Sequence, residues 1–547
     1  MNRRTGLLLM PLVLAACQEP LRDAARPYGD LAHRDLTSAP TLNLEERSRS
    51  APAAPESVAD VVPPALRASG DGSVEITLAL VRAAALEGNL DLAVDVLSPE
   101  IARTAEREEE AAFESLLHLG ARRSHTDSPT FLGTEGSLSD FTSLDAGVTL
   151  PLRTGGSLDF TFPIAKTSSN NPFSLLDPAY TAEWRFSFSQ PLLRGAGTRV
   201  NTHALRVART ESLSAQARTR LEVIRVLAAA DRAYWSLYAA QRRLDVARQQ
   251  YDVAVQQRDK AARRVAAGDL AQIEVVRAES GLASTLESVI VADALVRRQE
   301  RALKAAMNRD DLPIDGAELV LTRTDPAPLS LDLDPIALAD FAVATRMEML
   351  ELELALAIDS ASIDFAENGR LPLVALDYTY SVGGLGADYR SAIGQLPPHR
   401  FEDWSVGVRA EIPLGNEAAD ARLHRAILQR VQRLATREQR RQSIRQETFD
   451  ALDTLREAWQ RILAARQEVR LATRTLDGER NQFDQGLSTS TDVLDASSRL
   501  AQARSREIDA LSDYEIARID LAFATGTLLG HGRVRWGKDV SSGDGQE

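Results

Sequence analysis

The sequence predicts a mainly α-helical protein with four β-strands, built by internal duplication. Three observations predict this fold class. Proline is absent from two long tracts, between Pro191 and Pro313 and after Pro413, as uninterrupted helices require. Apolar residues in both tracts recur at alternating steps of three and four, the heptad pattern of packed helices. Four short runs alternate polar and apolar residues, as half-buried strands do.

The two helical tracts carry heptad seams that superpose. The first seam consists of Leu237, Ala240, Leu244, Ala247, Tyr251, Ala254, Arg258, Ala261 and Val265. The second consists of Leu455, Ala458, Ile462, Ala465, Val469, Ala472, Leu476, Glu479 and Phe483. Each member of the second lies 218 positions after its counterpart, and the same offset places Gly268 on Gly486. We interpret this as a duplication.

An insertion distinguishes the first half. Asn89 corresponds to Arg346, and Pro191 corresponds to Pro413, but the intervals are 102 and 67 positions. The difference predicts about 35 additional residues in the first half, which we place between about 120 and 155, where Gly, Ser and Thr are dense.

The four predicted strands cover residues 157–162, 182–189, 373–380 and 404–412. Their alternation, with aromatic residues at the ends, is typical of a barrel wall between lipid and water. Four strands cannot close a barrel, and open strand edges are not tolerated in hydrocarbon. We therefore expect other copies of the chain to complete it. Asn170-Asn171-Pro172 and the stretch 383–398 are expected to be loops on the outer side.

The first seventeen residues follow the plan of a secretory signal. A basic start and a short apolar run end in Leu14-Ala15-Ala16-Cys17, and Cys17 is the only cysteine of the 547 residues. This spacing resembles the bacterial lipoprotein signal, which implies that Cys17 carries acyl chains such as palmitate. Gln18, rather than an aspartate, then favours the outer membrane. An ordinary signal peptide with an incidental cysteine is the alternative.

These features divide the chain into six segments. They are a signal peptide (1–16), the lipidated cysteine with a Pro-rich linker (17–70), a first repeat (71–312), an inter-repeat linker (313–335), a second repeat (336–529) and a disordered tail (530–547).

Composition excludes several classes of function. The net charge of −14 argues against a nucleic-acid partner, because phosphate binding needs a cationic surface. The seven histidines are scattered without a pair at metal-ligand spacing, and no carboxylate is singled out by a partner. We therefore predict that the chain is not an enzyme and needs no metal or cofactor.

The chain resembles the TolC family of outer-membrane efflux proteins over roughly residues 71–529. The matching motifs are Asn89-Leu90-Asp91-Leu92, the run Gln190-Pro191-Leu192-Leu193-Arg194-Gly195, and the segment 483–496. The resemblance implies a homotrimer whose twelve strands form one barrel, continued by an α-helical barrel across the periplasm. It also implies a passive exit duct of an efflux or type I secretion system, with a periplasmic adaptor and an inner-membrane transporter as partners.

The resemblance places a gate at the periplasmic tip. It implies that Asp492 and Asp495, which share a helix face, form carboxylate rings in the bore, with Glu274 at the paired first-half position. Phe483 and Ser488 replace a tyrosine and an arginine of the closing network in the best-known member.

The same turns are implied to contact the adaptor. The candidate turn and docking residues are Gly268, Leu270, Gly486, Leu487, Ser488 and Thr489. A periplasmic coiled-coil lipoprotein that acts as a scaffold or adaptor, without a pore, is the alternative function. The sequence does not indicate the transported substrate.

Overall fold

The computed structural model describes residues 73–129, 136–316 and 318–532. The chain divides into two units, Met1–Val62 and Pro63–Glu547, and every described residue lies in the second. The expected signal peptide, Cys17 with the whole expected linker, and the expected tail from residue 533 onward therefore lie outside the described residues. Residues 530 and 531, which we expected in the tail, belong to the short helix α13.

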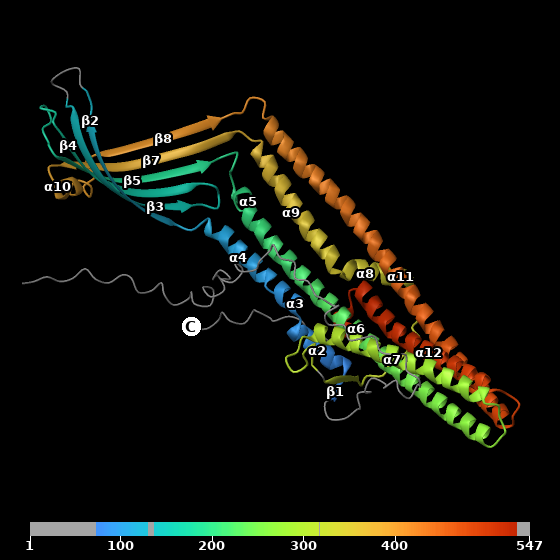
Figure 1. Ribbon diagram of the computed structural model, residues 1–547. Helices are drawn as coiled ribbons and strands as arrows, with labels where there is room; N and C mark the ends of the chain where they lie inside the picture. Colours follow the sequence, from blue (N-terminus) through green and yellow to red (C-terminus); the bar gives the residue numbers. More distant parts are fainter. Residues whose placement is uncertain (1–72, 130–135, 317, 533–547) are drawn as a thin grey trace, which may run out of the picture. The chain divides into compact units, whose positions relative to one another are not determined.

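Helices make up most of the described chain (Figure 1). They are α2 (Leu78–Gly88), α3 (Leu90–Asp95), α4 (Ser98–Ala111), α5 (Thr198–Asn201), α6 (His203–Ala266), α7 (Ile273–Met307), α8 (Pro335–Thr345), α9 (Met347–Gly369), α10 (Tyr389–Ile393), α11 (Glu417–Asp484), α12 (Ser490–Ala524) and α13 (Leu528–His531). None of the described helices is long and apolar enough to cross a membrane.

Two helical hairpins repeat the same plan. Helix α6 has 64 residues and returns as α7, while α11 has 68 residues and returns as α12. At 1.5 Å per residue, each outgoing helix is roughly 100 Å long. The predicted seams form the packing surface: Leu237, Ala240 and Ala261 are buried on α6, and Leu455 and Ile462 are buried on α11. The predicted duplication is thus visible as two long hairpins.

The strands form two sheets. They are β1 (Ser73–Ile76), β2 (Leu116–Asp127), β3 (Leu138–Pro151), β4 (Ser157–Ser169), β5 (Ala179–Pro191), β6 (Leu319–Thr322), β7 (Leu373–Gly386) and β8 (Glu402–Glu411). Strands β1 and β6 form a short parallel pair. The other six form one antiparallel sheet in the order β2-β3-β4-β5-β7-β8.

The prediction of four strands was wrong for this sheet. Strands β4, β5, β7 and β8 coincide with the four predicted runs, but β2 and β3 add a hairpin in the region where we placed the insertion. The sequence analysis missed these strands because polar and charged residues interrupt the apolar side of their alternation, for example Arg123 on β2 and Asp140 and Thr142 on β3.

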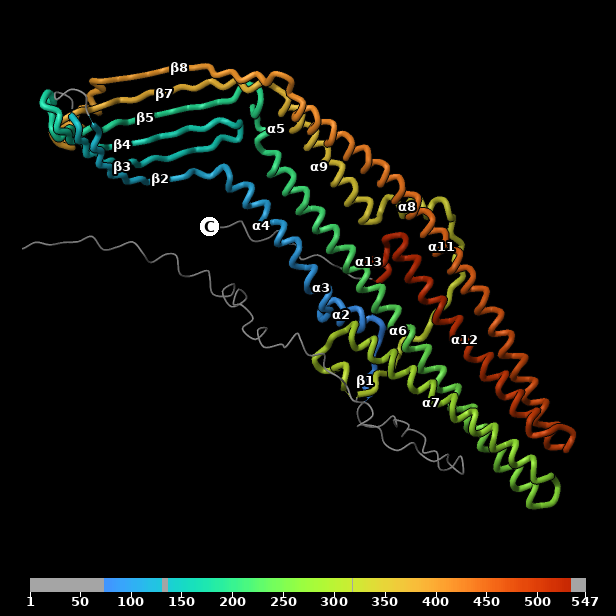
Figure 2. The backbone as a smooth tube through the Cα atoms, turned by 45° about the horizontal axis from the view of Figure 1, so that its top comes forward, coloured from blue at the N-terminus to red at the C-terminus, as the bar shows by residue number. Residues whose placement is uncertain are grey.

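The helices nearest the sheet form a layer in the same order as the strands. Helix α4 packs on α6, α6 on α9, and α9 on α11. Helix α4 leads into β2, β5 leads towards α6, α9 into β7, and β8 into α11. Figure 2 shows the strands side by side and these four helices continuing from them. The hydrophobic core lies further along the hairpins, where α2, α6 and α7 surround residues such as Tyr234 and Leu303.

Candidate functional site

The first candidate turn, between α6 and α7, ends its helix with a glycine in the left-handed conformation. Gly268 has φ +84°. Its amide donates to the carbonyl of Val265 at 3.0 Å, and the amide of Asp269 donates to the carbonyl of Arg264 at 2.9 Å. This pair of bonds is a Schellman motif, in which glycine avoids the steric cost of positive φ.

The second turn, between α11 and α12, repeats this geometry. Gly486 has φ +78°. Its amide donates to the carbonyl of Phe483 at 3.0 Å, and the amide of Leu487 donates to the carbonyl of Gln482 at 2.9 Å. All four positions lie 218 residues after their counterparts in the first turn. The two glycines therefore act as matched helix ends.

The predicted docking residues differ in exposure. Leu487 is 73% exposed, whereas Leu270 is half-buried against the cluster of Phe483 and Leu500. The Ser488 hydroxyl donates to the carbonyl of Glu479 at 3.2 Å and so closes the turn. Leu487 is thus the most available apolar side chain of the set.

Asp492 caps the helix in which it lies. Its carboxylate accepts hydrogen bonds from the amide and the hydroxyl of Thr489 at 2.8 and 2.7 Å, and the Thr489 hydroxyl accepts from the Asp492 amide at 3.3 Å. This arrangement is a capping box. The bonds from Thr489 lower the pKa of Asp492. Asp492 and Asp495 are both exposed on the first turns of α12, so the two carboxylates predicted for the gate do share an open face.

Glu274 occupies a different environment from its counterpart Asp492. It is buried, with 8% of its surface exposed. One carboxylate oxygen accepts from the amide of Ser490 at 3.3 Å, and the other pairs with Arg277 at 2.6 Å. Glu274 therefore joins the start of α7 to the start of α12 and presents no open carboxylate.

Phe483 lies at the centre of the tip. It is almost fully buried against Val493 and Leu500. The Arg264 guanidinium lies 5.3 Å from the ring centroid and also donates to the Phe483 carbonyl at 2.8 Å, while the Lys260 ammonium lies 5.6 Å from the ring. These distances are typical of cation–π contacts. Phe483 thus connects α6 with α11 inside one protomer.

Sequence reasoning missed the residues of the first hairpin that hold the second. Besides Arg264, they include Lys260, which forms an ion pair with Asp484, and Gln257, whose amide donates to the Ser490 hydroxyl at 3.3 Å. Gln257 and Ser490 are both buried. Gln257 is not a member of the first heptad seam, which runs through its neighbour Arg258, so the spacing carried no signal of its burial. The structure brings the predicted gate residues Glu274, Phe483 and Asp492 together at one tip. Of the predicted gate residues, only Asp492 and Asp495 are exposed.

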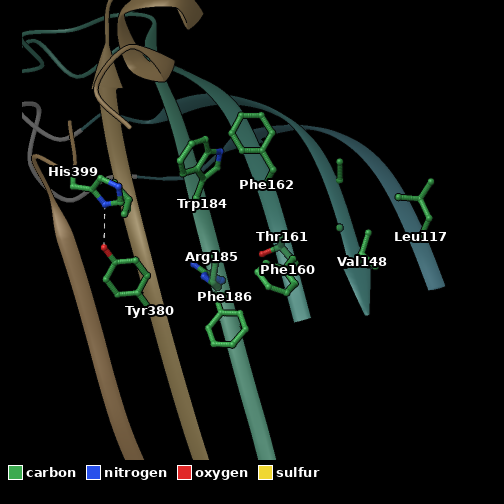
Figure 3. Close-up of a pocket in the computed structure, with 13 residues that line it drawn as sticks. Leu117, Val148, Phe160, Thr161, Phe162, Trp184, Arg185, Phe186, Tyr380 and His399 are labelled. Carbon is green, nitrogen blue, oxygen red and sulfur yellow. Dashed lines mark hydrogen bonds between the residues drawn. The ribbon is translucent and has the colours of Figure 1, made fainter. Parts of the chain in front are cut away.

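The six-stranded sheet has two chemically different faces. One face is apolar and aromatic, and a row across all six strands runs Leu117, Val148, Phe160, Phe186, Tyr380 and Trp404. Figure 3 shows five of these side chains on one side of the sheet, together with Trp184 and Phe162. Trp404 is 71% exposed and Trp184 is 47% exposed. Near the end of β7, Ala392 and Leu396 pack onto part of this face, and the Tyr380 hydroxyl bonds His399 at 3.1 Å.

The opposite face is polar. A neighbouring row reads Gly147, Thr161, Arg185, Ser381 and Asp403. Bonds between its side chains include Thr149 to Asp159 at 2.7 Å and Ser189 to Asp377 at 2.7 Å. A wide exposed apolar face backed by polar side chains is the pattern of a sheet between lipid and water.

Among the described residues, no group of three histidine, cysteine, aspartate or glutamate side chains is placed to hold a metal ion.

The second half of the chain, with β7, β8 and the second hairpin, matches a known family. The model of the outer membrane efflux protein (OEP) family matches residues 338–527. This half is an outer membrane efflux protein domain.

Two curated relatives and many solved structures extend the likeness beyond this efflux protein domain. The outer membrane protein TolC of Vibrio cholerae is 23% identical over 304 residues, which are 54% of this chain and 66% of TolC. Nodulation protein T of Rhizobium leguminosarum bv. trifolii is 24% identical over 291 residues, 52% of this chain and 60% of that protein. Both matches span less than two thirds of the relative.

The CmeC outer membrane channel of Campylobacter jejuni has the same fold, with a TM-score of 0.62 over 82% of this chain and 86% of CmeC. Its sequence identity is 13%, so the likeness concerns the fold. The efflux protein domain and the first half together therefore adopt the fold of outer-membrane channels.

Proposed function

We propose that this chain is the outer-membrane channel of a tripartite efflux or type I secretion system and acts as a passive exit duct. One observation carries the proposal: the sheet is apolar on one face and polar on the other across six strands, and it continues directly into long helical hairpins. A duct through lipid and a water-filled compartment needs this combination. The lipid anchor at Cys17 and the outer-membrane location belong to the same proposal.

The proposed channel is a homotrimer, and both ends of the helical layer support association of copies. On α3 and α4, the exposed side chains Leu90, Val94, Leu97 and Ile101 follow one helical face. On α11, Leu428, Val431 and Leu434 are exposed at similar spacing. Apolar stripes at the two edges of a layer are suited to contact between neighbouring copies.

The proposed gate lies at the tip, with Asp492 and Asp495 in two carboxylate rings. Because its pKa is lowered, Asp492 is ionised throughout the neutral range. Rings of carboxylates repel one another and attract cations, so divalent cations should block the mouth. Glu274 and Phe483 hold the two hairpin ends in position behind these rings. The exposed Leu487, with Ser488 and Thr489 beside it, is the proposed docking point for a periplasmic adaptor, which connects the duct to an inner-membrane transporter.

Single-channel conductance in planar bilayers tests this function, alongside the mass of the purified protein in detergent. We expect trimers with small currents that divalent cations reduce. The double variant Asp492→Ala with Asp495→Ala should conduct more at rest and lose most of the divalent block. Glu457→Ala, an exposed acid in the middle of α11, is the matched control and should behave as the wild type.

Two other outcomes would count against parts of the proposal. Monomers without current would favour a periplasmic scaffold without a pore. Trimers whose current and cation block are unchanged in the double variant would remove the two aspartates from the gate while leaving the channel intact.

A further inference from the structure

The hairpin of β2 and β3 is an integral part of the sheet. Strand β2 pairs with β3 from Leu116 opposite Thr149 to Asp127 opposite Leu138. Strand β3 pairs with β4 from Ser139 opposite Ser169 to Pro151 opposite Ser157. Both ladders run the whole length of the strands, so the hairpin widens the sheet instead of folding away from it. The second half of the chain has no counterpart, because α9 leads directly into β7, whereas α4 leads into β2 and β3 before β4.

The hairpin also continues both faces of the sheet. On the apolar side it contributes Leu117 and Leu119 from β2 and Leu144 and Val148 from β3, all of them exposed. On the polar side it contributes Ser143, whose hydroxyl bonds Asp145 at 3.3 Å. A plug inside a water-filled lumen would have no reason to carry an apolar stripe in register with the outer wall. The hairpin therefore has the composition of a barrel wall, with one side suited to lipid and the other side suited to water.

The two edges of the sheet are β2 and β8, and both are unpaired along the described chain. All ten residues of β8 and eleven of the twelve residues of β2 are exposed. In hydrocarbon, each unpaired backbone group costs several kcal/mol. Because six strands alternate in direction, β2 and β8 run antiparallel to each other. The β8 edge of one copy can thus pair with the β2 edge of the next in the same antiparallel pattern as the rest of the sheet.

The widths of the sheet and of the helical layer agree only when the hairpin is counted. Four helices packed 8–10 Å apart, in the order α4, α6, α9 and α11, cover roughly 35 Å. Six strands about 4.8 Å apart and tilted by about 40° cover roughly 38 Å along a barrel rim, whereas four strands cover roughly 25 Å. A sheet of six strands per copy is therefore about as wide as the helical layer into which it continues.

We propose that strand β2 is the docking edge for strand β8 of a second copy of this chain, so that each copy contributes six strands to a shared barrel. With three copies the barrel has eighteen strands, instead of the twelve that the family resemblance implies. The inserted hairpin is thus the subunit-joining element of the wall. This inference rests on the proposed channel function, since only a membrane wall requires closure.

Engineered cysteine pairs test which strand meets β8. Cys17 is the only natural cysteine, so new thiols give a clear signal. In one series, Val406→Cys on β8 is combined in turn with Leu117→Cys, Leu119→Cys and Ala121→Cys on β2. In the other series, it is combined with Leu158→Cys, Phe160→Cys and Phe162→Cys on β4. Three positions per strand allow for the stagger between neighbouring copies. Single variants are the controls.

We expect oxidation in membranes to convert the monomer into covalent dimers and trimers for at least one β2 pair, and a reductant to reverse this. The β4 pairs should remain monomeric on denaturing gels, because β2 and β3 would separate those cysteines by roughly 14 Å, beyond the reach of a disulfide. Cross-linking of a β4 pair would overturn the inference, since β4 would then be the docking edge.

The mass and the conductance of the same preparations separate this inference from the proposed function. Conducting trimers in which no β2 pair cross-links would reject β2 as the docking edge and leave the channel in place. Monomers without current would reject both.

Discussion

The tips of the two helical hairpins have the same backbone but different side-chain chemistry. Gly268 and Gly486 end α6 and α11 with the same left-handed turn and the same pair of hydrogen bonds. At the following equivalent positions, Glu274 is buried and reaches across to the other hairpin, whereas Asp492 is exposed and caps its own helix. The two tips therefore share one main-chain geometry, whereas the equivalent acidic residues Glu274 and Asp492 have different roles.

A second matched pair of positions shows the same difference. The chain breaks between α2 and α3 at Asn89, with φ −67° and ψ 124°, and between α8 and α9 at Arg346, with φ −70° and ψ 136°. Asn89 caps α3 by accepting from the amide of Leu92 at 3.0 Å. Arg346 is 4% exposed and pairs with Glu348 and Glu447. The duplicated breaks therefore differ in how much charge they bury.

The largest effect is expected from the variant Arg346→Ala. It leaves Glu348 and Glu447 with Arg440 as their remaining cationic partner, and breaking a buried pair costs at most about 3–5 kcal/mol. The matched variant Asn89→Ala removes only a helix cap, at a cost of about 1 kcal/mol. Denaturant unfolding in detergent measures both free energies. Equal losses in the two variants would mean that the buried charges contribute no more than the cap.

The acid dependence of stability should isolate Glu348. Burial alone would raise its pKa, but the hydrogen bonds from Arg346 and Arg440 outweigh this and lower the pKa from 4.5 to about 2. Because the folded pKa is depressed, the stabilisation is complete above about pH 4.5 and is lost as the pH falls to about 2. The shift corresponds to at most about 3 kcal/mol.

Thermal unfolding of the wild type and of Glu348→Gln over this pH range tests the assignment. The difference between the two proteins should be largest near neutral pH and should shrink to nothing near pH 2. A difference that does not change with pH would assign the stabilisation to packing instead of charge.

The smallest effect is expected at the tips. Glu274→Ala removes the acceptor of the Ser490 amide and the partner of Arg277, at a cost of about 1–2 kcal/mol. Asp492→Ala removes half of a capping box, at a cost of about 0.5–1 kcal/mol. Amide hydrogen exchange should rise in both tips for Glu274→Ala and only in the second tip for Asp492→Ala. Faster exchange confined to the first tip in Glu274→Ala would contradict the bridging role.

The sequence predicted the elements whose pattern is local. Both long hairpins follow from heptad spacing, and β4, β5, β7 and β8 follow from alternation with aromatic residues. The hairpin of β2 and β3 was missed because residues such as Arg123, Asp140 and Thr142 interrupt its apolar side, and its place in the sheet depends on a long ladder with β4. Strand pairing between such weakly patterned runs is decided by tertiary contacts, which composition does not report.

The site was predictable in outline only. The glycines and the paired acids follow from the internal offset, but the burial of Glu274 depends on Ser490, which lies 216 positions away in the sequence. Likewise, the cations beside Phe483 come from the other hairpin. No spacing rule within one helix indicates such contacts, because they arise from how two hairpins pack side by side.

The return helices α7 and α12 both have 35 residues. The helices that lead back from the two tips are therefore equally long, and Gly268 and Gly486 remain aligned when the sequences of the two halves are superposed. Insertions and deletions are constrained as a result. Loss of one heptad from each arm of a single hairpin would shorten it by about 10 Å and break the contact between Glu274 and Ser490. Viable length variants of this chain should therefore change both hairpins together, in equal steps.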